Sequence, residues 1–281
     1  MALLNLTEVL AHAGARQGVA AIDVIDYESA DAVFQTAAHL GVPVIVMVPE
    51  KAFPYLDVPL FFAFLVQRAR LSPVPVCLHL DHGESLEGVM IAIRHGCSSV
   101  MIDGSSLPFA ENVGLTCSVV DIAHRAGISV EAELGKVSGD QGNFESDGGA
   151  GNIYTSPAEA TRFAAETGVD ALAISFGTVH GVYRGAPRLD YELVRTIAAS
   201  IPTPLAMHGA SGLPDDEYRR AVQAGIRKIN LFTEISLAGV RAAHAAYESK
   251  AGKLHFAELV GMGKLAIAEQ AARYMRLISD L

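Results

Sequence analysis

Three histidines, His82, His180 and His208, each stand at or near the end of a separate apolar stretch of the sequence. Asp81 precedes the first of them, and Glu133 lies at the end of another apolar stretch. A single histidine in such a place usually has a structural role. Three imidazoles that converge, with carboxylates beside them, form the ligand set of a catalytic zinc with one position left open for substrate. These residue types therefore predict a metal site.

Glycines and hydroxyl side chains follow the same apolar stretches. Residues 208–212 read HGASG, and residues 230–233 read NLFT. Backbone N–H groups in glycine-rich turns and at helix N-termini bind phosphate without any arginine. We therefore expect Gly181, Ser211 and Thr233 to supply N–H and hydroxyl donors to a phosphate group.

The elements that must position these residues form a repeating pattern of apolar strand and helix. Eight apolar segments alternate with helical segments, at 18–25, 42–48, 74–82, 98–105, 128–135, 170–181, 203–211 and 226–233. Eight such units in about 250 residues are typical of an α/β fold, the (β/α)8 TIM barrel. A doubly wound sheet is the alternative, but no GxGxxG pattern follows the first strand. In a barrel the carboxyl ends of all strands meet at one face, which brings the histidines together.

The remaining segments frame this barrel. Residues 1–18 predict an extra N-terminal helix, and the residues after 252 predict a C-terminal helical tail. Because no break in composition divides the chain, we expect residues 1–281 to form a single domain. Glycines are expected to end several helices just before the next strand, at Gly41, Gly96, Gly127, Gly168 and Gly225. The connection from 135 to 156 is long and rich in glycine, so we expect a mobile functional lid there.

Composition excludes several classes of function. The chain has 281 residues, of which 51% are hydrophobic and 19% charged, and its net charge is −10. An acidic chain of this kind is not expected to bind nucleic acid or an anionic membrane. The N-terminal residues lack the pattern of a signal peptide, and no apolar run is long enough to span a membrane. The three cysteines form no CxxC pair, so we expect buried thiols in a cytoplasmic protein.

Ordered motifs over most of the chain carry a family resemblance. The segments HLDHGESL, MIDGS, ENV, VEAELG, GTVHGVY, HGASGLPDD and KINLFTE occur in this order. Together they resemble the zinc-dependent class II aldolases of the tagatose-bisphosphate and fructose-bisphosphate aldolase family. The family fold is a (β/α)8 barrel, in agreement with the count of strands and helices.

The resemblance implies roles for the residues of the predicted site. Zinc would be held by His82, His180 and His208, with Glu133 as an alternate or nearby ligand and Asp81 as the acid/base. The dihydroxyacetone phosphate half of the substrate would be bound by Gly181, Gly209, Ser211, Asn230 and Thr233, with a monovalent cation (Na+ or K+) beside the phosphate. The expected reaction is reversible aldol cleavage of a phosphorylated ketose, a ketose 1-phosphate or 1,6-bisphosphate. A homodimer or homotetramer is the expected assembly.

The sequence departs from the family pattern mainly on the aldehyde side of the site. The family lid usually carries a glutamate, where this chain has Gln141; Asp23, at the end of the first strand, is a candidate replacement for that carboxylate. Pro49-Glu50-Lys51 follow the second strand instead of small residues, so Lys51 could contact the substrate. Leu259 replaces an arginine that binds a second phosphate in some relatives, which favours substrates with one phosphate.

Two other interpretations follow from the same sequence. Lys51 and Lys136 lie just past strand ends, and one of them could form a Schiff base in a lyase of a different class. Alternatively, the change at Gln141 is consistent with a relative that binds metal and phosphosugar without turnover.

Overall fold

The computed structural model describes residues 2–14, 17–139, 154–183, 185 and 187–281. The strands are β1 (Val19–Asp23), β2 (Val44–Pro49), β3 (Val76–Gly83), β4 (Ser99–Ile102), β5 (Ser129–Leu134), β6 (Ser138–Gly139), β7 (Ala171–Ile174), β8 (Val179–His180), β9 (Leu205–Met207) and β10 (Ile226–Leu231). The helices are α1 (Leu6–His12), α2 (Tyr27–Leu40), the 3-10 helix η1 (Glu50–Tyr55), α3 (Val58–Arg70), α4 (Leu86–Arg94), α5 (Phe109–Arg125), α6 (Pro157–Thr167), α7 (Tyr191–Ser200), α8 (Asp215–Ala224), α9 (Thr233–Ser249) and α10 (Phe256–Ser279).

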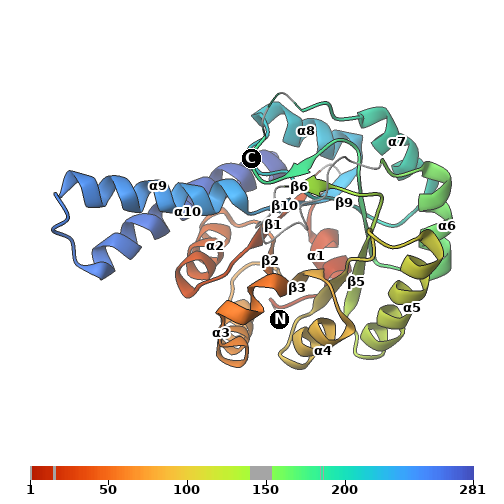
Figure 1. Ribbon diagram of the computed structural model, residues 1–281, viewed down its shortest axis with the longest axis horizontal. Helices are drawn as coiled ribbons and strands as arrows, with labels where there is room; N and C mark the ends of the chain where they lie inside the picture. Colours follow the sequence, from red (N-terminus) through yellow and green to blue (C-terminus); the bar gives the residue numbers. More distant parts are fainter. Residues whose placement is uncertain (1, 15–16, 140–153, 184, 186) are drawn as a thin grey trace.

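Within the described residues, eight parallel strands close into a barrel in the order β1-β10-β9-β7-β5-β4-β3-β2. Helices surround the barrel on its outside (Figure 1). The predicted (β/α)8 TIM barrel is therefore confirmed, including the extra N-terminal helix and the C-terminal helices. The two short strands β6 and β8 form a separate two-stranded sheet outside the barrel.

The inside of the barrel changes character along its axis. At the end where the strands begin, α1 buries its apolar face against the first inward-facing residues of the strands. This apolar cluster contains Leu6, Val9, Leu10, Ala13, Val19, Ala21, Ile45, Met47, Cys77 and Ala171. Farther along the same strands, the buried side chains include histidines, carboxylates and a lysine. Among the described residues, the apolar cluster therefore fills the N-terminal end of the barrel, and the polar groups lie toward the carboxyl ends of the strands.

The predicted glycine helix ends are confirmed. All five glycines have positive φ: Gly41, Gly96, Gly127, Gly168 and Gly225. At Gly41 and Gly168 the backbone is left-handed and the N–H donates to the carbonyl four residues earlier, at Ala37 and Ala164. These turns let each helix reverse into the next strand at little conformational cost.

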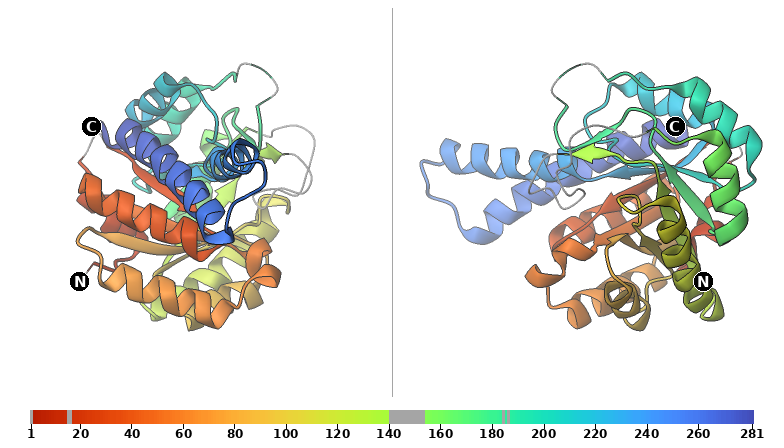
Figure 2. Two further views of the ribbon diagram at one scale, coloured as in Figure 1. Left: turned by 90° about the vertical axis from the view of Figure 1, so that its left-hand side faces the viewer. Right: turned by 45° about the vertical axis from the view of Figure 1, so that its right-hand side comes forward.

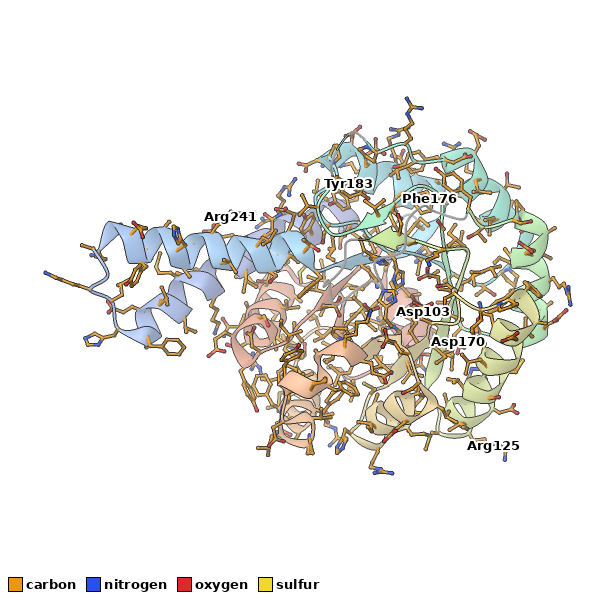
Figure 3. The ribbon with its side chains drawn as sticks, viewed as in Figure 1. Asp103, Arg125, Asp170, Phe176, Tyr183 and Arg241 are labelled. Atoms are coloured by element: carbon orange, nitrogen blue, oxygen red, sulfur yellow. The ribbon has the colours of Figure 1, made fainter. Side chains whose placement is uncertain are left out.

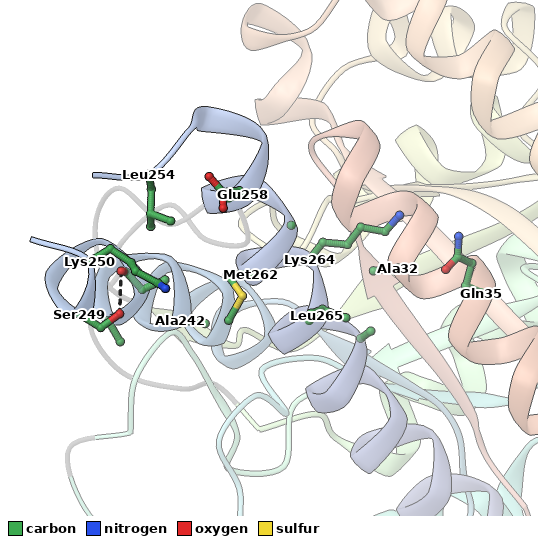
Figure 4. Close-up of a pocket in the computed structure, with 14 residues that line it drawn as sticks. Ala32, Gln35, Ala242, Ser249, Lys250, Leu254, Glu258, Met262, Lys264 and Leu265 are labelled. Atoms are coloured by element: carbon green, nitrogen blue, oxygen red, sulfur yellow. Dashed lines mark hydrogen bonds between the residues drawn. The ribbon is translucent and has the colours of Figure 1, made fainter. Parts of the chain in front are cut away.

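Helices α9 and α10 form a long hairpin that projects from the barrel (Figures 1 and 2). The two helices approach closely at Gly239 and Gly263, where an added Cβ on Gly263 would lie 3.4 Å from the Gly239 carbonyl oxygen. A groove of about 940 Å³ lies between this hairpin and α2, and its lining includes five alanines, Met262 and Leu265 together with polar and charged side chains (Figure 4). Its lining, as far as the chain is described, does not include the three histidines.

The described cysteines are all free thiols. Cys77 and Cys97 are buried, as expected, whereas Cys117 is only partly buried. No helix among the described residues is long and apolar enough to span a membrane. Most of the glycine-rich connection, residues 140–153, lies outside the described residues. The predicted mobility of a lid concerns these residues and so stays a prediction.

Candidate active site

Asp81 and His82 are neighbours in the sequence, yet both contribute to the same site. The register of β3 against β4 shifts between Leu80 and Gly83, which pair with Val100 and Ile102. The shift inserts an extra residue in β3, a β-bulge, and His82 has a positive φ of 41°. Bulges redirect side chains next to active sites, and a strained φ is typical of such positions. The bulge therefore turns His82 toward the face that Asp81 already occupies.

His82, His180 and His208 converge above the barrel interior, as predicted. One ring nitrogen from each lies within 4.8 Å of the others, and all three side chains are buried. The Nε2 atom of His82 is 3.0 Å from Nδ1 of His208. Both ring nitrogens of His180 are buried without a hydrogen-bond partner in the described chain. Buried imidazole nitrogens that face one another in this way are satisfied by one shared cation, so this donor set fits a metal.

The strand that precedes His180 is shorter than expected. Barrel strand β7 ends at Ile174, and His180 lies in β8, which pairs with β6 rather than with the barrel. The prediction that a barrel strand runs directly into His180 was therefore wrong. The turn at Gly177, which has a φ of 118°, ends the apolar run before the histidine.

Tyr183 links the loops that carry two of the histidines, a role that the sequence did not suggest. Its hydroxyl accepts from the Val179 N–H at 3.2 Å and donates to the Gly209 carbonyl at 2.7 Å. Gly209 follows His208, and an added Cβ there would lie 2.6 Å from the Val179 backbone. Tyr183 and Asp103 both lie on the barrel and not on the projecting hairpin (Figure 3). This close packing fixes His180 relative to His208.

Carboxylates surround the histidines. Asp103 Oδ2 accepts from His82 Nδ1 at 2.9 Å, which leaves Nε2 of His82 facing the other two rings. Glu133 Oε2 lies 4.0 Å from Nδ1 of His208. His82, Asp103 and Glu133 also form a second group of potential ligands within 4.8 Å. This geometry is consistent with the predicted place of Glu133 beside the metal.

Burial and these charges shift the pKa values of the buried histidines and of Glu133 in different directions. Burial lowers the pKa of His180 and His208 well below 6.5, and the positive charge of His82 lowers both further. Burial would also lower the pKa of His82, but Asp81 and Asp103 together outweigh it and raise that pKa well above 6.5. Burial raises the pKa of Glu133, and Asp103 adds to the effect. His82 therefore has the highest proton affinity of the three histidines, and a cation bound there would compete with that proton.

Asp81 is fully buried and lies within reach of both the histidines and the phosphate side. Its Oδ1 accepts from Nδ2 of Asn230 at 2.9 Å, and its Oδ2 is 3.8 Å from Nε2 of His82. Asn230 also lies 3.3 Å from His208. The predicted acid/base and one predicted phosphate-side residue are thus in direct contact.

The predicted phosphate residues gather where β9 and β10 end. Gly181 and Gly209 have positive φ values of 91° and 64°. Ser211 Oγ accepts from the Phe232 N–H at 2.9 Å and so joins the two loops. Helix α9 begins at Thr233, and its N-cap residue, Phe232, makes no side-chain capping hydrogen bond. The N-terminus of a helix beside glycine turns is an environment suited to an anion.

A buried lysine was missed in the sequence. Lys228 is completely buried, and its Nζ lies 3.1 Å and 2.9 Å from the two oxygens of Glu131. Lys51 and Lys136 were therefore not the only lysines near the site. The signal was available, because a lysine two residues before Asn230 in a parallel strand faces the same side as that asparagine.

The other predicted residues lie at the end of β1, at the rim, or outside the described chain. Asp23 is buried at the end of β1. Lys51 is partly exposed, and its Nζ is 3.1 Å from Glu84. Its neighbour Glu50 accepts from the Glu84 N–H and the Ser85 hydroxyl, at 2.7 Å and 2.6 Å, and so fixes the start of α4. Gln141 lies outside the described residues.

Leu259 does not lie beside this site in its own chain. It belongs to the first turn of α10, at the outer end of the projecting hairpin (Figure 1). The preference for one phosphate that was inferred from Leu259 therefore has no support within a single chain, because the chain continues through the whole of α9 before it turns back.

Comparisons with known proteins agree with the fold. The sequence model of the class-II fructose-bisphosphate aldolases matches residues 4–280. The chain is 38% identical over 220 residues to the D-tagatose-1,6-bisphosphate aldolase subunit GatY of Klebsiella oxytoca, covering 78% of this chain and 77% of that protein.

The chain is also similar to solved structures of aldolases. The crystal structure of the YdjI aldolase from Escherichia coli K12 superposes with a TM-score of 0.86 and 32% identity, over 98% of this chain and 97% of that one. The crystal structure of a putative fructose-1,6-bisphosphate aldolase from Coccidioides immitis superposes with a TM-score of 0.87 and 27% identity, over 98% of this chain and 96% of that one. The chain therefore belongs to the class-II fructose-bisphosphate aldolase family. It is a carbon–carbon lyase of a family that acts on small phosphorylated sugars through a bound metal.

Proposed function

We propose that this protein, acting as one domain of residues 1–281, catalyses zinc-dependent aldol cleavage of a phosphorylated ketose to dihydroxyacetone phosphate and an aldehyde. The substrate is a ketose 1-phosphate or a 1,6-bisphosphate. One observation carries the proposal: three buried histidine nitrogens lie within 4.8 Å of one another, directly beside the buried Asp81. The identity to a tagatose-bisphosphate aldolase subunit supports the substrate class.

His82, His180 and His208 would hold the zinc, and Glu133 would be a nearby or alternate ligand. Imidazole nitrogens are preferred zinc ligands, and three of them leave one position for substrate. Bound zinc would supply Lewis-acid stabilisation for the negative charge that develops when the carbon–carbon bond breaks. Asp103 orients His82 through its Nδ1 at 2.9 Å, as partners behind metal-bound histidines usually do.

Asp81 is the proposed general base. In the cleavage direction it accepts the proton of the C4 hydroxyl, the C3–C4 bond breaks, and the electron pair forms the enediolate of dihydroxyacetone phosphate. The aldehyde product leaves, and protonation of the enediolate carbon completes the reaction. Asn230 holds Asp81 through a 2.9 Å hydrogen bond, which fixes the acceptor oxygen before substrate binds.

The phosphate of the dihydroxyacetone phosphate half would bind at the β9 and β10 ends. Gly181, Gly209, Ser211 and Thr233 would provide N–H and hydroxyl donors around the start of α9. A monovalent cation, Na+ or K+, beside the phosphate would offset part of its charge. Lys51, at the rim, would contact the aldehyde half.

The enediolate proton transfer needs a second carboxylate. We propose Asp23 for this role, since it is buried at the carboxyl end of β1 and on the inward-facing side of the barrel. In this proposal Gln141 has no acid/base role.

A retro-aldol screen tests the proposed function. Phosphorylated ketoses are incubated with the zinc-loaded protein, and release of dihydroxyacetone phosphate is followed with and without a chelator. We expect cleavage that the chelator abolishes and zinc restores. Covalent trapping by borohydride would instead indicate a Schiff base on lysine, and normal zinc content without any cleavage would indicate a non-catalytic relative.

A further inference from the structure

The ion pair between Lys228 and Glu131 lies inside the barrel, below the histidines. Both side chains are completely buried, and the Nζ atom contacts both carboxylate oxygens, at 3.1 Å and 2.9 Å. A buried ion pair contributes little net stability compared with apolar residues of similar size. Stability of the fold therefore does not by itself explain why these charges lie inside the barrel.

Glu131 connects the lysine to one of the histidines. Its Oε1 atom accepts from Nε2 of His208 at 2.8 Å. A neutral imidazole carries its hydrogen on one nitrogen only, so this bond assigns the hydrogen to Nε2. The other nitrogen, Nδ1, then has its lone pair free, and it is the atom that faces His82 at 3.0 Å.

We propose that Lys228 is a positioning residue that holds Glu131 on His208, so that Nδ1 of His208 faces the metal. This inference rests on the proposed three-histidine zinc site. Glutamate has three rotatable side-chain bonds and here carries a buried charge. With both its oxygens near Nζ, it is restrained in one orientation and its charge is balanced. Without the lysine, nothing else described in contact with Glu131 has a full positive charge, since His79 is 3.7 Å away and burial keeps its pKa well below 6.5.

The proposal and simple electrostatics predict opposite changes in metal affinity when Lys228 is removed. Removing a buried cation near a metal site should tighten metal binding if charge alone mattered, because like charges repel. Loss of the carboxylate that orients a histidine ligand instead weakens metal binding, usually by 10- to 100-fold. The two explanations are therefore separated by the direction of the change.

The experiment measures Zn2+ affinity by competition with a chromophoric chelator, and the visible spectrum of the Co2+-substituted protein. The test variant is Lys228→Met. The matched control is Lys264→Met, which also removes the lysine of a lysine–carboxylate pair, with Asp31 at 2.5 Å, but on the outside of the barrel. We expect Lys228→Met to bind Zn2+ about 10- to 100-fold more weakly than the control and to change the Co2+ spectrum. Binding within tenfold of the control, or tighter binding, would overturn the proposal.

A second pair of variants covers the case in which Lys228→Met does not fold because Glu131 is left as an unpaired buried charge. Glu131→Gln and the double variant Glu131→Gln/Lys228→Met are compared. If the lysine acts through Glu131, the first variant weakens Zn2+ binding about tenfold and the second binds no more weakly than the first. Unchanged affinity in Glu131→Gln, or a further tenfold loss in the double variant, would contradict the proposal.

The wild-type protein separates this inference from the proposed function. If the wild-type chain does not bind Zn2+ or does not cleave any phosphorylated ketose, the proposed function fails. If it does both, and the Lys228 variants bind the metal as the control does, only the role of Lys228 fails.

Discussion

The two ends of the barrel are built from the same strands but contain different kinds of side chain. Along β3, the inward-facing residues are Cys77, then His79, then Asp81; along β1 they are Val19, Ala21 and Asp23. At the first end α1 packs its leucines and valine against the strands, and the contacts are apolar. At the other end, the inward positions carry ionisable groups that bond to one another. The change occurs within two residues of strand, or about 7 Å.

This difference separates stability from chemistry along one axis. The apolar end buries large side chains with no polar atom to satisfy, so it can contribute to folding without any partner. The polar end buries charged and imidazole groups, which are costly unless they are paired with one another or with a cation. Changes at the polar end should therefore alter the reaction, and changes at the apolar end should alter stability.

The largest effect is expected for His208→Ala. The change removes one of three proposed ligands from a buried site, so tightly bound zinc should be lost and cleavage should fall by roughly 10³-fold or more, since the metal supplies several kcal/mol of charge stabilisation. Metal analysis of the purified protein checks this. The control is His124→Ala, which removes an exposed histidine bonded to Asp170 outside the barrel. Full retention of tightly bound zinc by His208→Ala would remove this residue from the ligand set.

Asp81→Asn should lower the rate without removing the metal. The amide has the same shape and can still accept from Asn230, but it cannot take up a proton, so kcat should fall by about 10²–10⁴-fold. Asp31→Asn, on α2 outside the barrel, is the matched control. Steady-state kinetics measure the loss of rate, and the zinc content of each purified variant shows whether the metal is retained. A near-normal rate in Asp81→Asn would place the base elsewhere.

Asp23→Asn should affect one proton transfer selectively. If Asp23 handles the enediolate proton, exchange of the dihydroxyacetone phosphate C3 hydrogen with deuterium oxide should slow by about 10²-fold. NMR of dihydroxyacetone phosphate incubated with the zinc-loaded variant measures this exchange without the aldehyde half. Exchange at the normal rate would exclude Asp23 as the group that transfers the enediolate proton, and would favour a residue in the segment that contains Gln141.

A smaller effect is expected for Lys51→Ala. Lys51 is partly exposed and paired with Glu84, so loss of its contact with the aldehyde half should lower kcat/KM by no more than about tenfold, in the range of a surface ion pair. The measurement compares ketose 1-phosphates with the matching 1,6-bisphosphates, for which we expect no strong preference for the bisphosphate. A preference above tenfold that disappears in Lys51→Ala would identify Lys51 as the contact for a second phosphate.

Leu6→Ala should have the smallest effect on the reaction and a large effect on stability. Leu6 is completely buried at the apolar end, so the free energy of unfolding should fall by about 2–5 kcal/mol. Zinc affinity and kcat should stay within about threefold of normal. Leu60→Ala, at an exposed leucine, should change stability by less than about 0.5 kcal/mol. Loss of zinc in folded Leu6→Ala would show that the two ends are not independent.

The sequence by itself determined the barrel and most of the residues of the candidate site. The eight apolar segments and their glycine helix ends follow from local chemistry, because strand burial and left-handed turns leave a direct pattern in the residue types. The three histidines of the candidate metal site were visible because each lies at or near the end of an apolar stretch, and the carboxyl ends of barrel strands converge.

Tertiary structure decided what depends on register and on residues far apart in the chain. The bulge in β3 that turns His82 toward Asp81 is a shift of pairing against β4, and a sequence does not state its register. In the same way, the sequence does not show that barrel strand β7 ends before His180, because His180 lies in β8, which pairs with β6 outside the barrel. Lys228 and Glu131 are 97 positions apart, so their contact, and its link to His208, exists only once the barrel has closed.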